Sequence, residues 1–197
     1  MRYEAVVIGV SAGGIEALKV ILPGLPKFFP LPIVIVQHRD GRSDSFLAEY
    51  LNRTSGVAVT EAEDKEPLFA GRAYLAPSGY HLLIESDRSF SLSVDARVHH
   101  SCPSIDVLFE SAADVFGESL IGVVLTGANA DGAQGLRAIK ACGGLAIVQD
   151  PETAQATAMP RAALESTQVD YIVGLRQIAP LLIQMSMLRE EAYGATG

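Results

Sequence analysis

Short apolar runs recur along the chain and predict strands. The runs are rich in Val and Ile and lie at residues 6–8, 33–36, 73–75, 121–125, 145–148 and 171–173. Several of them are apolar throughout, without the alternation of a half-exposed strand. That pattern is typical of strands covered on both faces of a sheet.

Segments with helical periodicity separate these runs. They lie at residues 14–22, 43–52, 104–116, 133–141 and 160–166, with a closing helix expected at 178–188. Strands that alternate with helices indicate an α/β fold, with a mostly parallel sheet and helices on both sides. In the middle of the chain, residues 80–84 and 90–94 flank a polar group and predict an antiparallel hairpin.

The chain length fits one well-buried domain. Of the 197 residues, 49% are hydrophobic and 19% are charged, which is enough for one core and short for two. We expect a single domain over residues 1–190 and a frayed tail over residues 191–197. The first strand begins almost at the N-terminus, so we expect neither a signal peptide nor a preceding domain.

Charge, hydropathy and cysteine usage exclude several classes of partner. The formal net charge is −8, and Lys and Arg are scattered singly. We expect no nucleic acid, because binding phosphates takes a basic patch, and no membrane insertion, because no apolar run is long enough. Cys102 and Cys142 lack metal-ligand spacing, which predicts reduced thiols, no metal site and a cytoplasmic location.

Three reactive side chains follow predicted strands. Ser11 follows the first run in a Gly-Val-Ser-Ala-Gly turn, His38 follows the second, and Asp131 lies in the glycine-rich segment after the run at 121–125. The carboxyl ends of parallel strands meet at one edge of a sheet. A hydroxyl, an imidazole and a carboxylate at that edge are the components of a Ser-His-Asp triad, in which the imidazole takes the serine proton and the carboxylate orients the imidazole.

Each of these residues also has a simpler interpretation. Ser11 and Asp131 precede predicted helices and could be only their N-caps, and His38 could be a satisfied, partly buried histidine. The glycine turn could instead hold a phosphate, but a P-loop needs a lysine where Ile15 and Glu16 stand. The alternative to a hydrolase is therefore a nucleotide-binding or non-catalytic α/β signalling module.

Other polar residues receive lesser roles. His81 is assigned a structural or rim-lining position, and Asp106 is expected to complement the dipole of its own helix. His99 and His100 either line a substrate groove or are plain exposed loop residues.

As a set, the motifs resemble the catalytic domain of the protein-glutamate methylesterases of bacterial chemotaxis, the CheB type. The resemblance runs from about residue 6 to about residue 175. Its landmarks are residues 8–14, 36–38, 74–77 with Gly79 and His81, 103–109, 125–127, 131–133, 149–151 and 159–160. Their order and spacing together are far more specific than any one of them.

The resemblance implies a doubly wound α/β fold and a serine hydrolase that uses no metal or cofactor. It implies Ser11 as nucleophile, His38 as general base and then acid, and Asp131 as the orienting carboxylate. Backbone amides would hold the oxyanion, and those assigned to this role are Ala12, Gly13, Gly127 and Ala128. The implied substrates are glutamate γ-methyl esters on the cytoplasmic helices of methylated chemoreceptors, and some members also deamidate receptor glutamines.

The chain departs from the family pattern in a few places. Ala12 stands where Thr is common, Ala128 stands where Met is common, and residues 99–102 replace a commonly basic stretch. Regulated members carry an N-terminal receiver domain, which we do not expect here. The sequence therefore leaves two alternatives, a stand-alone esterase or one regulated by a separate chain.

Overall fold

A parallel sheet runs through the centre of the molecule. The computed structural model describes residues 2–38, 46–98 and 100–188. The strands of the sheet are β1 (Ala5–Val10), β2 (Ile33–Gln37), β3 (Ala58–Glu61), β4 (Arg72–Leu75), β7 (Leu120–Val124), β8 (Leu145–Gln149) and β9 (Tyr171–Val173). Their order in the sheet is β3-β4-β2-β1-β7-β8-β9, and every pairing is parallel.

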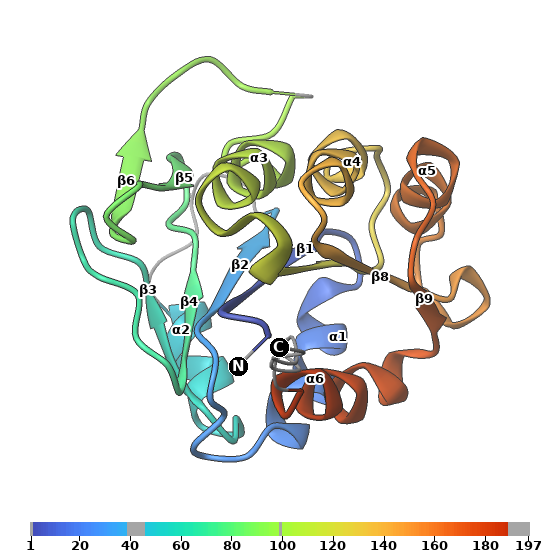
Figure 1. Cartoon of the computed structure of the whole chain (residues 1–197), viewed down its shortest axis with the longest axis horizontal. Coiled ribbons are helices and arrows are strands. Elements are labelled where there is room, and N and C mark those ends of the chain that lie inside the picture. The colour runs from blue at the N-terminus through green and yellow to red at the C-terminus, as the bar shows by residue number, and fades with distance from the viewer. Residues whose placement is uncertain (1, 39–45, 99, 189–197) are drawn as a thin grey trace, which may run out of the picture.

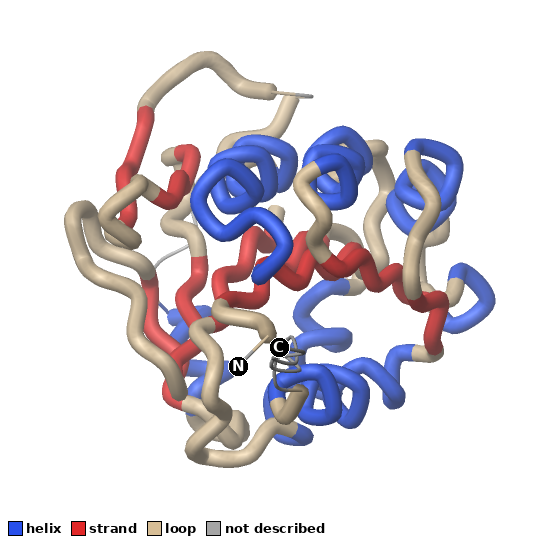
Figure 2. Tube along the Cα trace, in the orientation of Figure 1, coloured by secondary structure: helices blue, strands red, loops and turns tan. Residues whose placement is uncertain are grey.

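Helices cover both faces of this sheet, which gives three layers (Figures 1 and 2). One face carries α3 (Ile105–Phe116), α4 (Ala133–Ala141) and α5 (Ala158–Ser166). The other carries α1 (Gly14–Ile21), α2 (Phe46–Asn52) and α6 (Ile178–Ser186). The predicted fold class, an α/β fold with a mostly parallel sheet between helices, is confirmed.

Burial on both faces explains the apolar runs. In β1, Val6 and Ile8 pack into the core beneath α1 and α6, whereas Val7 packs into the core beneath α3 and α4. All three side chains are fully buried, and each such burial stabilises the fold by about 2 kcal/mol. A polar residue on either face of β1 would lose this term and also its hydration.

The predicted hairpin is present and stands apart from the main sheet. Strands β5 (His81–Ile84) and β6 (Phe90–Ser93) pair antiparallel as a separate two-stranded sheet. The hairpin packs on α3, where the amide of Ile84 donates to the Ser111 hydroxyl at 3.1 Å. Helix α3 therefore contacts both the hairpin and the main sheet.

Some boundaries differ from the prediction. Strand β3 was not predicted, because it is an edge strand with exposed Ala58 and Thr60 around a single buried Val59. Helix α5 begins at Ala158 rather than at Pro160; proline is tolerated there because the first turn of a helix needs no amide donor. The start of the helix expected at 43–52 and the tail expected at 191–197 lie outside the described residues.

Candidate active site

The three predicted residues meet at the carboxyl edge of the sheet. Strand β1 lies between β2 and β7, so the chain leaves β1 in one direction and later returns to its other side. Ligands of such sheets bind at this switch point. Ser11 comes directly after β1, His38 directly after β2, and Asp131 lies between β7 and α4.

Hydrogen bonds connect the three side chains in series. His38 Nδ1 lies 3.2 Å from the Ser11 hydroxyl, and His38 Nε2 lies 2.7 Å from Asp131 Oδ2. With a hydrogen on Nε2, the ring donates to Asp131 and leaves Nδ1 free to accept a proton from Ser11. In the serine protease template, Nε2 faces the serine and Nδ1 faces the aspartate, so the two nitrogens have exchanged partners here. The proton transfers that the arrangement permits are the same.

Asp131 is the most tightly held member of the series. Its carboxylate is fully buried and also accepts hydrogen bonds from the Ser104 hydroxyl at 2.9 Å and from the amides of Ile105 at 2.8 Å and Asp106 at 3.0 Å. These amides start α3 and have no partner within their own helix. Asp131 therefore caps α3, and the interpretation of Asp131 as an N-cap of the helix that it precedes is wrong.

The electrostatics of this environment favour the ionised carboxylate. Burial raises the pKa of Asp131, but hydrogen bonds from His38 and from the amides of Asp106 and Ile105 outweigh burial and hold the pKa below its ordinary value. The N-terminal dipole of α3 acts in the same direction. Asp131 is thus an anion at neutral pH and can stabilise an imidazolium on His38.

Asp106 makes the reciprocal contact. Its Oδ1 accepts hydrogen bonds from the amides of Gly132 at 2.9 Å and Gly135 at 2.7 Å, at the start of α4. The side chain of Asp106 therefore caps α4, and it also lies in the first turn of its own helix, as expected for a carboxylate that complements the dipole. Each of the two helices is capped by a carboxylate from the other's segment, which fixes Asp131 between them.

Gln37, the last residue of β2, ties the Ser11 turn to His38. Its amide nitrogen donates to the carbonyl oxygens of Ser11 at 3.0 Å and His38 at 2.9 Å. Glycine is required at two positions of the turn, because Gly13 has a φ of 79° and a side chain on Gly14 would collide with Gln37. The Ser11 hydroxyl does not cap α1, whose N-cap is Gly13, and so it remains free to contact His38.

Thr126 ties the same turn to the loop after β7. Its carbonyl accepts from the Ser11 amide at 3.0 Å, and its hydroxyl donates to the Ala12 carbonyl at 2.8 Å. Its own amide donates to Gln149 at 2.9 Å. Through Gln37 and Thr126, the backbone of the Ser11 turn is bonded to the end of β2 and to the loop after β7.

One of the four amides expected to hold an oxyanion is already engaged. The Gly127 amide donates to the carbonyl of Ala156 at 3.0 Å, which excludes Gly127 from this role in the structure. Within the described residues, the amides of Ala12, Gly13 and Ala128 donate to no protein acceptor, and Ala12 and Ala128 are exposed. These three remain as candidate oxyanion donors.

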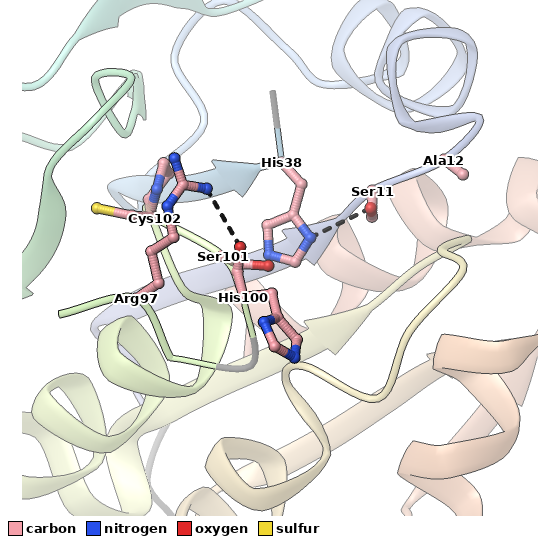
Figure 3. Close-up of a pocket in the computed structure, with 8 residues that line it drawn as sticks. Ser11, Ala12, His38, Arg97, His100, Ser101 and Cys102 are labelled. Carbon is pink, nitrogen blue, oxygen red and sulfur yellow. Dashed lines mark hydrogen bonds between the residues drawn. The ribbon is translucent and has the colours of Figure 1, made fainter. Parts of the chain in front are cut away.

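A cavity of about 320 Å³ opens in front of Ser11 and His38. Figure 3 shows the His38 ring directed toward Ser11, with Ala12 on the far side of Ser11. The cavity is lined by Ser11, Ala12, His38, Arg97, His100, Ser101, Cys102 and Pro103. His100 lines this cavity and is also exposed, so both alternatives for it stay open, and His99 lies outside the described residues.

Cys102 lines this cavity, and its sulfur is directed away from His38 and Ser11 (Figure 3). Burial raises its pKa, and nearby Arg97 only partly offsets that effect. The thiol is therefore protonated at neutral pH, the form in which a cysteine is a weak nucleophile. Cys102 and Cys142 are both free, as predicted.

The supporting residues around the triad were not predicted as parts of a site. They are Gln37, Ser104, Thr126 and Gln149. A signal existed for the two glutamines, since each is a polar residue that ends an otherwise apolar strand and is buried there. No signal in the local sequence pairs Ser104 with Asp131, which lies 27 residues away.

The described part of the chain offers neither a candidate metal site nor a candidate membrane span. No cluster of three or more His, Cys, Asp or Glu side chains in residues 2–38, 46–98 and 100–188 could hold a metal ion. No helix in this part of the chain combines the length and apolar content needed to cross a bilayer.

Comparison with known proteins identifies the family. The family model for CheB methylesterase matches residues 6–182. The chain belongs to the CheB methylesterase family. The crystal structure of the CheB methylesterase catalytic domain of Thermotoga maritima superposes with a TM-score of 0.89 at 36% sequence identity, and covers 94% of this chain and 100% of that one.

Relatives in this family differ in length. A Leptospira interrogans protein, provisionally named protein-glutamate methylesterase/protein-glutamine glutaminase, is 57% identical over 94% of this chain and 96% of its own length. Protein-glutamate methylesterase/protein-glutamine glutaminase 1 of Carboxydothermus hydrogenoformans is 43% identical over 89% of this chain and 53% of its own length. The chain therefore spans nearly all of the first relative and about half of the second.

Proposed function

We propose that this protein is a serine hydrolase that removes methyl groups from glutamate γ-methyl esters of chemoreceptors. The observation that carries the proposal is the hydrogen-bonded series from Ser11 through His38 to a buried, ionised Asp131 at the edge of a cavity. Membership of the CheB methylesterase family and the names of the relatives supply the substrate class. Since the substrate glutamates lie on the cytoplasmic helices of receptors, we place the reaction in the cytoplasm.

The first half of the reaction is acyl transfer to Ser11. His38 Nδ1 takes the hydroxyl proton as Ser11 Oγ bonds to the ester carbonyl carbon. Asp131 stabilises the imidazolium through Nε2. The amides of Ala12, Gly13 and Ala128 are the donors that would hold the oxyanion, and one such donor is worth about 3 kcal/mol in known enzymes. The intermediate then expels methoxide, which takes the proton from His38 and leaves as methanol.

The second half releases the enzyme. A water molecule gives its proton to His38 and bonds to the carbonyl carbon of the acyl-enzyme, and the bond to Ser11 Oγ breaks as His38 returns the proton. The product is a glutamate side chain. The same steps on a glutamine expel ammonia instead of methanol, which is the glutaminase activity in the relatives' names.

We propose no bound metal or cofactor for this reaction, because Ser11, His38 and Asp131 supply the nucleophile, the base and the charge that acyl transfer needs. The partners are methylated chemoreceptor helices, and a separate regulatory chain is a further proposed partner. The net charge of −8 makes nucleic acid an unsuitable one.

Methanol release from methylated receptor tests the proposal. The wild-type chain should release methanol, and Ser11→Ala should lower kcat by about 10³-fold or more while the thermal unfolding transition stays in place. Ser111→Ala, which removes a hydroxyl on α3 that bonds only the hairpin and its own helix, serves as the matched control and should keep full kcat. A Ser11→Ala protein with full activity would refute the proposed nucleophile.

The same preparation separates the proposal from its alternatives. A fluorophosphonate, which reacts with activated serines, should label wild-type protein at Ser11 and leave Ser11→Ala unlabelled. A folded wild-type protein that neither releases methanol nor becomes labelled would favour the non-catalytic module. Calorimetric binding of ATP at micromolar concentration would favour the nucleotide-binding module.

A further inference from the structure

We propose that Ser104 is a positioning residue for the triad, whose buried hydroxyl fixes the Asp131 carboxylate so that its other oxygen faces His38. Ser104 touches neither Ser11 nor the cavity, and it acts only through Asp131. The inference rests on the proposed function, since it concerns the same reaction.

The two carboxylate oxygens of Asp131 have separate sets of donors. Oδ1 accepts from the Ser104 hydroxyl at 2.9 Å and from the Asp106 amide at 3.0 Å. Oδ2 accepts from His38 Nε2 at 2.7 Å and from the Ile105 amide at 2.8 Å. The hydroxyl therefore holds the oxygen that His38 does not use, and this fixes the rotation of the carboxylate about its own axis.

A serine in the position of Ser104 usually has another role. It is the N-cap residue of α3, where a serine hydroxyl normally accepts from the helix's own first amides. Here that side-chain cap is absent, because Asp131 accepts from the amides of Ile105 and Asp106 instead. The Ser104 hydroxyl is thus a donor to the carboxylate rather than an acceptor from the helix.

His81 fixes the backbone of Ser104 through a hydrogen bond. Both residues are buried, and the Ser104 amide donates to His81 Nδ1 at 3.2 Å. Since Nδ1 accepts, the ring hydrogen lies on Nε2, which donates to the Ala96 carbonyl at 3.2 Å. His81 therefore anchors the backbone that aims the hydroxyl, in agreement with the structural role expected for it.

The consequence for catalysis is one of orientation. A serine hydroxyl has one hydrogen, and here a fully buried carboxylate receives it, so the bond is charge-assisted and does not compete with water. Without it, Asp131 keeps three donors and its charge, but Oδ1 is held on one side only. The His38 ring is then bonded to a carboxylate that can rotate, so the ring is less tightly oriented. The hydrogen bond between Ser11 and His38 is therefore formed less often.

The test compares Ser104→Ala with Ser111→Ala, a hydroxyl loss on the same helix outside the site. Ser104→Ala should lower kcat for methanol release, and the rate of fluorophosphonate labelling of Ser11, by about tenfold. The KM should not change, because Ser104 does not touch the cavity. Ser111→Ala should match the wild type in both rates, and Ser104→Thr, which restores a hydroxyl, should recover most of the loss.

A double-mutant cycle asks whether Ser104 acts through Asp131. In an Asp131→Asn background, Ser104→Ala should lower the labelling rate no further, because the carboxylate that it positions is gone. A full tenfold loss in that background would overturn the proposal, and so would a folded Ser104→Ala protein with wild-type rates. If Ser104→Ala does not fold, Ser104→Cys, of similar size but a weak donor, is measured in the same cycle with the same two criteria.

The two proposals fail in different ways. A wild-type protein that is labelled at Ser11 but releases no methanol refutes the proposed substrate, and the labelling rates of the variants still decide the role of Ser104. A wild-type protein that releases methanol while Ser104→Ala keeps the same rates refutes the role of Ser104 alone. A wild-type protein that does neither refutes both.

Discussion

The two ends of the Ser-His-Asp series are held in different ways. We call Asp131 and its partners Ser104 and Asp106 the buried side, and residues Ser11, Ala12 and Gly13 the open side. On the buried side, one carboxylate with no exposed surface takes four hydrogen bonds. On the open side, the Ser11 hydroxyl has one hydrogen-bond contact among the described residues, to His38 at 3.2 Å, and Ala12 next to it is exposed.

The difference has a physical reason. A buried charge is stable only when its hydrogen-bonding capacity is satisfied, so the buried side must be completely bonded. In the proposed reaction an ester must reach Ser11, so the open side must keep a hydroxyl and several amides without protein partners. The hydrogen bonds that orient the series thus lie on the buried side, away from the cavity. The ring of His38 connects them to Ser11.

Asp131→Asn removes the charge of the buried side and should have the largest effect. The kcat for methanol release should fall by about 10³- to 10⁴-fold, as in serine proteases with the same change. The free energy of unfolding should fall by about 3 kcal/mol, because an amide nitrogen would face buried donors. Kinetics and urea unfolding measure the two effects. Asp114→Asn, at an exposed position of α3, is the control and should keep the wild-type kcat. A kcat of Asp131→Asn within tenfold of the wild type would contradict the prediction.

Gln37→Ala tests how the open side is positioned. The change removes the amide that joins the Ser11 and His38 carbonyls, so the distance between the Ser11 hydroxyl and the His38 ring is less well fixed. We expect kcat to fall by about tenfold with a small change in KM. Gln184→Ala, on the exposed surface of α6, should change neither. If Gln37→Ala raised KM alone, Gln37 would instead act on substrate binding.

The pH dependence of stability should report the buried side. The pKa of Asp131 is lower in the folded protein than in the unfolded chain, where it is about 3.9. Its ionisation therefore stabilises the fold above about pH 4, and this contribution is lost as the pH falls through the folded-state pKa. The difference in the free energy of unfolding between wild type and Asp131→Asn, measured by urea unfolding, should therefore shrink as the pH falls below about 4. If the difference in the free energy of unfolding grew below about pH 4, burial rather than the hydrogen bonds would dominate the pKa of Asp131.

The comparison also shows what could be predicted from the sequence. Strands such as β1 and β7 are apolar on both faces, so each gives a strong local signal, and residues that follow such strands must meet at one edge. That reasoning was enough to expect Ser11, His38 and Asp131 near one another. Strand β3 was missed because only Val59 of its exposed edge is buried.

The bonding of the buried side was beyond prediction. An aspartate followed by glycine and a helix is typical of an N-cap, so local sequence favours Asp131 as a cap of α4 and Asp106 as a complement to α3. The actual contacts are exchanged between segments 25 to 29 residues apart. Only the packing of α3 against α4 brings these groups together, and no local pattern encodes that packing.

Ala12→Thr should have the smallest effect and tests the open side alone. Ala12 is exposed and lines the cavity beside Ser11, so the free energy of unfolding should change by less than about 0.5 kcal/mol. A threonine at this position adds a hydroxyl beside Ser11, and we expect kcat to change by less than about threefold, because the roles proposed for His38 and Asp131 do not depend on that hydroxyl. Steady-state kinetics on methylated receptor measure this, with Ala12→Val as a control that has the same shape and no hydroxyl. A tenfold gain for Thr but not for Val would show that the open side, and not the buried one, limits the rate of this chain.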